Sequence, residues 1–113
     1  APSKEQPYFM QVIGPIKTKS WGILKKITSE WIQELPKEIE AQYHHALALY
    51  QLGELVSAKN ILKKVIKENN KHALAYLYLY KISIKENQKD DESYYKTRVL
   101  ELDNSLIDQK NET

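Results

Sequence analysis

The chain has 113 residues, which is enough for one domain with a modest hydrophobic core. Apolar residues make up 42% and charged residues 28%, with only 3 Gly and 4 Pro, so collagen-like, low-complexity and wholly disordered chains are excluded. The absence of Cys excludes disulfides, thiolate metal sites and a Cys nucleophile, and a net charge of +2 does not by itself indicate a nucleic-acid or membrane partner.

Residues 1–18 are predicted to form an irregular N-terminal segment. They contain three of the four prolines, and proline removes a backbone donor and disfavours helix at the residue before it. The chain opens at Ala1 without an initiator Met, so we expect either a processed export product, periplasmic or secreted, or a part of a longer protein, cytoplasmic included. No stretch approaches the roughly 20 apolar residues of a membrane-spanning helix, so no membrane span is expected.

The first strong helical pattern lies between Lys19 and Pro36. Its apolar residues recur at three and four positions, the period of one helix face: Trp21, Leu24, Ile27, Trp31 and Leu35. A second helix is predicted over 38–52, and it ends at Gly53, where a left-handed C-terminal cap belongs.

Three further helices are predicted after Gly53. The helix at 55–68 has apolar residues on one side and lysines on the other. The helix at 72–86 is apolar nearly all round and must be covered on more than one side. The fifth helix, at 91–103, can be capped by Asp90 or Asp91. No segment shows the alternating pattern of a strand, so the fold is predicted to be all-α with about five helices.

An internal repeat is the most informative feature of the sequence. The segments WIQELP at 31–36, VIKENN at 65–70 and VLELDN at 99–104 are spaced by 34 residues and by 34 again. In each copy a bulky apolar pair closes a helix and is followed by charged residues and then Pro or Asn. A 34-residue period built from two helices is typical of a stacked helical array.

The residues of this repeat resemble the tetratricopeptide repeat (TPR) family. Ala46 and Ala58 match the small residues at the closest approach of its two helices, 53–54 matches its inter-helix turn, and Val65 matches a small apolar position near the end of its second helix. In the next copy Tyr76, Leu79 and 99–104 match the corresponding positions. The resemblance implies a right-handed α-solenoid of antiparallel helix pairs over 19–106, with a degenerate repeat to 38, repeats at 39–72 and 73–106, and a polar tail at 107–113.

The sequence also departs from the family pattern at both ends. Tyr80 and Glu92 occupy the small positions of the last repeat, so its helices are expected to approach less closely. In the first copy Val12 and Leu24 replace the small pair, and Pro15 interrupts its first helix, so that unit is expected to be degenerate or to act as a cap.

In the TPR family the first helix of each repeat lines a concave groove. The resemblance therefore implies a partner-binding groove formed by Tyr43, His44, Leu47, Tyr50, Leu74, Leu77, Tyr78, Lys81 and Ile84. Tyrosine gives a large contact area at low entropy cost, so an apolar or amphipathic peptide is the expected ligand. Some family members clamp a C-terminal carboxylate here with basic and Asn side chains; this chain has tyrosine and leucine at those positions, which disfavours such a ligand. The alternative is that the N-terminal segment or a dimer partner simply buries these residues.

The expected class is a non-enzymatic protein-interaction module, such as an adaptor, assembly factor or chaperone, with no cofactor and no metal. His44 and His45 are adjacent and point about 100° apart on a helix, so they cannot chelate one metal together. Helix capping accounts for Asp90 and Asp91 without catalysis. The sequence contains no phosphate-binding glycine loop and no nucleophile elbow.

A lysine stripe on the third helix supports a competing interpretation, a nucleic-acid-binding helical domain. It comprises Lys59, Lys63, Lys64, Lys67 and Lys71. Arginine makes the commonest specific base contact, and the single arginine, Arg98, lies outside the stripe, so nucleic acid is disfavoured. The all-round apolar helix is also compatible with a homodimer or with a larger parent protein.

Overall fold

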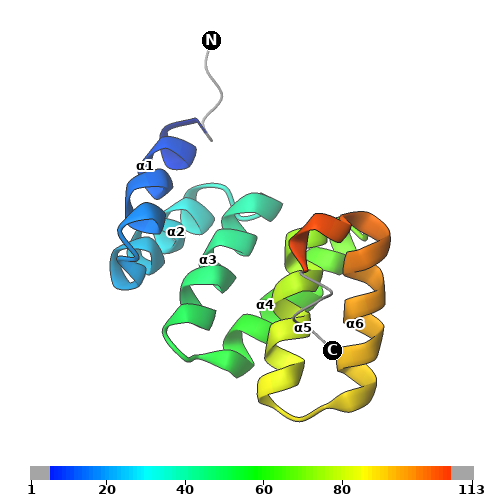
Figure 1. Ribbon diagram of the computed structural model, residues 1–113. Helices are drawn as coiled ribbons and strands as arrows, with labels where there is room; N and C mark the ends of the chain where they lie inside the picture. The colour runs from blue at the N-terminus through cyan, green and yellow to red at the C-terminus, as the bar shows by residue number, and fades with distance from the viewer. Residues whose placement is uncertain (1–5, 108–113) are drawn as a thin grey trace. The chain divides into compact units, whose positions relative to one another are not determined.

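The structure, a computed structural model, describes residues 6–107 and is all-α over that range (Figure 1). Six α-helices follow one another, with a short 3-10 helix at the end: α1 (Gln6–Lys17), α2 (Trp21–Glu34), α3 (Ile39–Gln51), α4 (Leu55–Glu68), α5 (Ala73–Lys85), α6 (Lys89–Leu102) and η1 (Asn104–Leu106). The predicted all-α class is confirmed, and the five predicted helices correspond to α2 to α6 within a few residues.

The sixth helix, α1, lies where the sequence predicted an irregular segment, and that prediction is wrong. Pro7 lies in the first turn of α1. Backbone N–H groups in the first turn make no intrahelical hydrogen bond, so the N–H that proline lacks costs the helix nothing there. Pro15 falls in the last turn and costs the helix a single hydrogen bond. Both prolines therefore occupy positions that tolerate them, which a count of prolines does not reveal.

The turns inside the three helix pairs α1–α2, α3–α4 and α5–α6 repeat at intervals of 34 residues. Each contains one residue with positive φ: Lys19 at 57°, Gly53 at 83° and Asn87 at 58°. Each also has the long-range bond of a Schellman cap: Ser20 N–H donates to Pro15 O, Glu54 N–H to Leu49 O and Gln88 N–H to Ser83 O. The left-handed cap predicted at Gly53 is confirmed, and the first helix pair has the same turn.

The second helix of each pair also ends at equivalent positions. The amides of Leu35, Asn69 and Asp103 donate to carbonyls four residues earlier, at Trp31, Val65 and Val99. These are the three segments in which the sequence shows its 34-residue spacing. The backbone therefore follows that period in all three helix pairs.

The predicted capping of the fifth helix by Asp90 or Asp91 is wrong. The cap residue of α6 is Gln88, and its side chain makes no capping hydrogen bond. Asp90 and Asp91 lie instead in the first turn of α6, where carboxylates interact favourably with the positive end of the helix dipole. By contrast, α5 has a side-chain cap, since His72 Nδ1 accepts from the amide of Ala75 at 3.2 Å.

The chain divides into two compact units, Ala1–Ile61 and Leu62–Thr113, with the boundary inside α4. In the first unit α2 packs against both α1 and α3. Its buried residues include Val12, Leu24, Thr28, Trp31, Ala41, Ala46 and Ala58. Thr28 is polar, and its hydroxyl lies 2.9 Å from the carbonyl of Leu24, which satisfies it inside the core.

In the second unit α5 packs against α6, and η1 packs against α6 (Figure 1). The buried residues include Leu62, Val65, Ala75, Tyr76, Leu79, Ile82, Tyr95 and Val99. Arg98 of α6 donates to the carbonyl of Asn70 at 2.9 Å, and its guanidinium lies 5.1 Å from the Tyr76 ring centroid. This side chain joins α6 to the turn that precedes α5.

Candidate protein-binding surface

The nine residues of the predicted groove lie on two helices, four on α3 and five on α5. The α3 residues belong to the first unit and the α5 residues to the second. The two rows differ in how much of them is exposed.

The α3 row is largely covered. Tyr43 and Leu47 are only 5% and 7% exposed, and His44 and Tyr50 are half-buried. Burial raises the pKa of the Tyr50 hydroxyl. These side chains therefore offer little surface to a ligand in the structure.

His44 belongs to an aromatic cluster that joins three helices. Its ring lies 6.4 Å from Phe9 of α1, 5.8 Å from Trp31 of α2 and 5.0 Å from Tyr43. Tyr8 stacks on Trp31 at 5.5 Å and also donates a hydrogen bond to Glu34. Residues of the N-terminal helix thus pack on His44, as the alternative interpretation of the groove residues proposes for an N-terminal segment.

The α5 row is more accessible, and we call it the α5 stripe: Leu74, Leu77, Tyr78, Lys81 and Ile84. These residues recur every three or four positions and share one face of the helix. Leu74 is 39% and Ile84 43% exposed, Tyr78 is half-buried, Lys81 is exposed, and only Leu77 is buried. Large apolar side chains thus remain partly in water at the two ends of the stripe, at Leu74 and Ile84.

The charge of α5 is of one sign. Lys81 and Lys85 are its only charged residues, and both lie in its C-terminal half. The Lys81 ammonium lies 5.5 Å from the centroid of the Tyr78 ring, which is within cation–π range. The α5 stripe therefore combines exposed apolar groups with a positive charge held beside an aromatic ring.

His45, one of the histidines singled out in the sequence, contacts a buried polar residue of α2. His45 Nδ1 lies 2.8 Å from the Thr28 hydroxyl, so His45 is engaged in the core of the first unit. Burial lowers the pKa of His45, and the nearby charge of Lys25 lowers it further. Within residues 6–107 no three His, Cys, Asp or Glu side chains are grouped closely enough to hold a metal ion.

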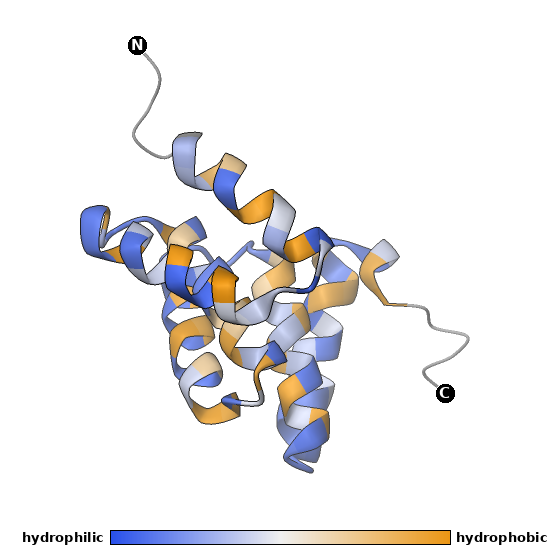
Figure 2. Ribbon diagram, turned by 90° about the vertical axis from the view of Figure 1, so that its left-hand side faces the viewer, coloured by the Kyte–Doolittle hydropathy of each residue, from blue (hydrophilic) through white to orange (hydrophobic). Residues whose placement is uncertain are grey.

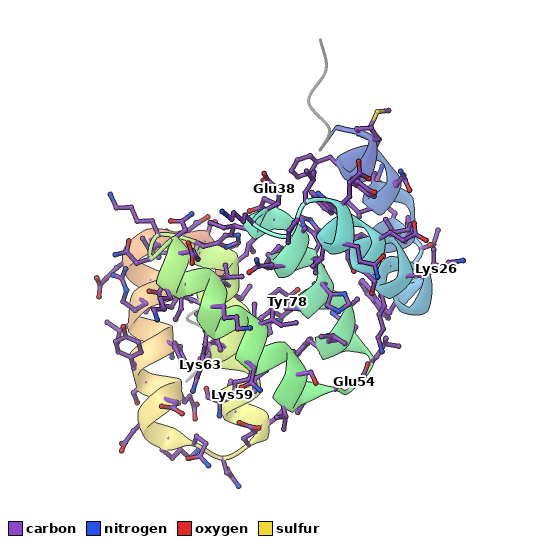
Figure 3. The ribbon with its side chains drawn as sticks, turned by 180° about the vertical axis from the view of Figure 1, so that it is seen from behind. Lys26, Glu38, Glu54, Lys59, Lys63 and Tyr78 are labelled. Carbon is purple, nitrogen blue, oxygen red and sulfur yellow. The ribbon has the colours of Figure 1, made fainter. Side chains whose placement is uncertain are left out.

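The lysine stripe lies on and just after α4. Lys59, Lys63 and Lys67 recur one turn apart along that helix, and Figure 3 shows the first two as side chains of α4. Lys63 and Lys67 are exposed. Arg98 does not extend this surface, because its guanidinium already binds Glu101 and the Asn70 carbonyl.

Sequence reasoning missed two features of the first unit. One is the aromatic cluster around Trp31. The other is a pair of exposed apolar residues on α1, Met10 at 75% and Ile13 at 51% exposed. Both were missed because residues 1–18 were expected to be irregular. The three-residue spacing of Met10 and Ile13 is the signal that would have placed them on one helix face.

Neither the protein-family models nor the curated proteins give a match to this chain. The helices of residues 6–107 are each too short or too polar to cross a membrane.

Proposed function

We propose that the chain is a non-enzymatic protein-interaction module, and that its α5 stripe binds an apolar or amphipathic peptide or helix of a partner protein. One observation carries the proposal: two large apolar side chains on one face of α5 stay exposed, Leu74 at 39% and Ile84 at 43%, with the half-buried Tyr78 between them. Covering apolar surface stabilises a complex by about 25 cal/mol for each Å² removed from water. Burial of this stripe is therefore a driving force for binding.

The charge of α5 favours a ligand with a carboxylate among its apolar side chains. Lys81 is the one charged member of the α5 stripe, so an Asp or Glu of the ligand placed beside it would be attracted to its ammonium. The ammonium of Lys81 is placed beside Tyr78, so an apolar contact and a charge contact can be made by neighbouring ligand residues.

We further propose that the helix pairs stack as a TPR-like right-handed α-solenoid and act in an adaptor, assembly-factor or chaperone role. The support is the 34-residue recurrence of the positive-φ turn at Lys19, Gly53 and Asn87. In such arrays each pair buries its apolar face on its neighbours. The resemblance to the TPR family implies that the first helix of each pair lines the concave surface. The α5 stripe lies on a first helix.

A peptide-display selection against the full chain tests the proposed function. A random library of 12-residue peptides is panned on the wild type, on Lys81→Glu and on Lys63→Glu. The wild type should enrich peptides that have apolar residues three or four apart and an Asp or Glu beside them. In Lys81→Glu the acidic preference should disappear or reverse to Lys or Arg, because the charge facing the ligand is inverted.

Lys63→Glu is the matched control, since Lys63 is also an exposed lysine but lies on α4. It should leave the selected consensus unchanged. If no peptide is enriched, or if Lys63→Glu changes the consensus as much as Lys81→Glu, the α5 stripe is not the binding surface.

A second candidate function is nucleic-acid binding by the lysine stripe, favoured by the exposure of Lys63 and Lys67. Titration against duplex DNA at two salt concentrations distinguishes the two functions. Tight binding with a steep salt dependence would favour the lysine stripe, and absence of binding would remove this candidate.

A further inference from the structure

We propose that His45 is a proton-sensitive switch of the first unit: it takes up its proton at Nε2, and the charge gained there competes with Lys25 for the carboxylate of Glu54. His45 lies on α3, Lys25 lies on α2, and Glu54 is the residue before α4. All three belong to the first unit, so the switch is independent of the α5 stripe in the second.

The hydrogen bonds of Thr28 determine which ring nitrogen of neutral His45 carries the hydrogen. The buried Thr28 hydroxyl oxygen lies 2.9 Å from the carbonyl oxygen of Leu24 and 3.1 Å from that of Lys25. It also lies 2.8 Å from His45 Nδ1. A hydroxyl has one proton to donate, and a carbonyl oxygen can only accept. The hydroxyl therefore donates within its own helix and accepts from His45, so Nδ1 carries the hydrogen.

Nε2 is consequently the nitrogen at which His45 gains a proton on acidification. Because Nδ1 is a donor in both charge states, protonation does not break the hydrogen bond to Thr28. With the opposite tautomer, the added proton would set two donors against each other and the ring would have to turn. Protonation of His45 therefore changes the charge of the site while its ring stays in place.

Two charged side chains from neighbouring elements act on His45. Lys25 and Glu54 form an ion pair with 3.0 Å between Nζ and Oε2. Burial lowers the pKa of His45, the charge of Lys25 lowers it further, and the charge of Glu54 raises it. On α3 itself, the adjacent His44 packs against Trp31, and its Nδ1 bonds to the carbonyl of Glu40.

A proton on His45 changes the charge balance around Glu54. Two cations then lie near one carboxylate, so His45 and Lys25 repel each other and both attract Glu54. The side chains of Lys25 and Glu54 are 41% and 44% exposed, so both can reorient without disturbing the core. In Figure 2 hydrophilic and hydrophobic residues are interspersed along the helices, and α2 follows this pattern, with the partly exposed Lys25 three residues before the buried Thr28.

The ion pair connects α2 to the start of α4. The carbonyl of Glu54 accepts from the amide of Ala58 in the first turn of α4, so the Glu54 backbone is part of that helix end. Acidification is therefore expected to weaken the connection between α2 and α4 when Glu54 turns from Lys25 toward His45.

NMR of the full chain with ¹⁵N-labelled histidines tests the assigned tautomer. A long-range ¹H–¹⁵N correlation spectrum, recorded above the pH at which His45 titrates, should show a protonated Nδ1 and an unprotonated Nε2. The His45 signals are those that disappear in His45→Gln. An unprotonated Nδ1 in neutral His45 would overturn the proposal.

The pKa of His45, measured by NMR titration in charge variants, tests the coupling. It should rise in Lys25→Gln, because a repelling cation is removed, and fall in Glu54→Gln, because an attracting anion is removed. Lys26→Gln is the matched control, since Lys26 is an exposed lysine next to Lys25 on the same helix, and it should leave the pKa unchanged (Figure 3). An unchanged pKa in both Lys25→Gln and Glu54→Gln contradicts the coupling, as does a rise in Lys26→Gln equal to that in Lys25→Gln.

The carboxyl ¹³C signal of Glu54 reports the change of partner directly. In the wild type it should shift at the pH at which His45 titrates, and in His45→Gln that step should be absent. A Glu54 signal that does not respond to the titration of His45, or that keeps the same step in His45→Gln, would show that the two side chains do not form a switch.

Discussion

Tyr43 of α3 and Tyr78 of α5 differ in burial because they are not equivalent in the 34-residue period: Tyr43 corresponds to Leu77, which is also buried. Tyr43 is 5% exposed, whereas Tyr78 is half-buried beside Lys81. Removing a buried aromatic ring typically costs about 3–5 kcal/mol. Tyr43→Ala should therefore destabilise the fold by roughly that amount, and Tyr78→Ala by clearly less, in urea denaturation. Equal losses would show that both tyrosines are core residues.

The titration of His45 predicts how stability changes with pH. Burial holds the pKa of His45 below its ordinary value of about 6.5, so below that pH the unfolded chain takes up a proton that the folded chain does not. Stability should therefore fall as pH falls from about 6.5, by at most about 1.4 kcal/mol for each pH unit from this residue.

The variant His45→Gln should lose this contribution while retaining a side chain able to contact Thr28, its partner at 2.8 Å. Urea denaturation at several pH values between 5 and 7.5 gives the difference in slope between wild type and variant. An identical slope in both proteins would mean that His45 titrates as freely when folded as when unfolded.

At the scale of the elements, substitutions at Lys19 and Gly53 in opposite directions test whether their two turns have the same geometry. Lys19 and Gly53 share one turn geometry with positive φ, which costs a non-glycine residue roughly 1–2 kcal/mol. Lys19→Gly should therefore stabilise the fold by about 1 kcal/mol, and Gly53→Ala should destabilise it by a similar amount. Thermal denaturation of the two variants measures both changes, and a loss of stability in Lys19→Gly would argue against the shared geometry.

Local sequence signals predicted most of the helices but not all of the turns. The period of apolar residues located α2 to α6, and Gly53 marked its turn, because both signals are local. The turn at Lys19 was not foreseen, since lysine has no preference for positive φ and only the surrounding hydrogen bonds hold it there. The helix α1 was not predicted either, because the cost of a proline depends on which turn of a helix it occupies.

The helices that carry the predicted groove residues were predictable from the sequence, but the exposure of those residues was not. The sequence places Tyr43 and Leu77 on the expected faces of their helices, since periodicity determines the face. Whether a side chain is covered depends on contacts between segments distant in the sequence, such as Phe9 with His44. For that reason the α5 stripe could be separated from the covered α3 row only in the structure.

At the scale of the whole molecule, the aromatic cluster and the α5 stripe differ in exposure. The aromatic cluster packs α1, α2 and α3 together in the first unit, and the α5 stripe is the proposed partner-binding surface. Two exposed lysines differ in their surroundings: Lys81 lies beside an aromatic ring and apolar neighbours, whereas Lys63 lies on a stripe of lysines.

The most direct test of the central claim is isothermal titration calorimetry with one acidic, apolar peptide enriched on the wild type. The Kd of that peptide should rise roughly 30-fold in Tyr78→Ala, which corresponds to about 2 kcal/mol for an aromatic anchor. It should stay within about twofold of the wild-type value in Lys63→Ala, a surface change remote from the α5 stripe. Equal affinity for all three proteins would contradict the claim that α5 carries the binding surface.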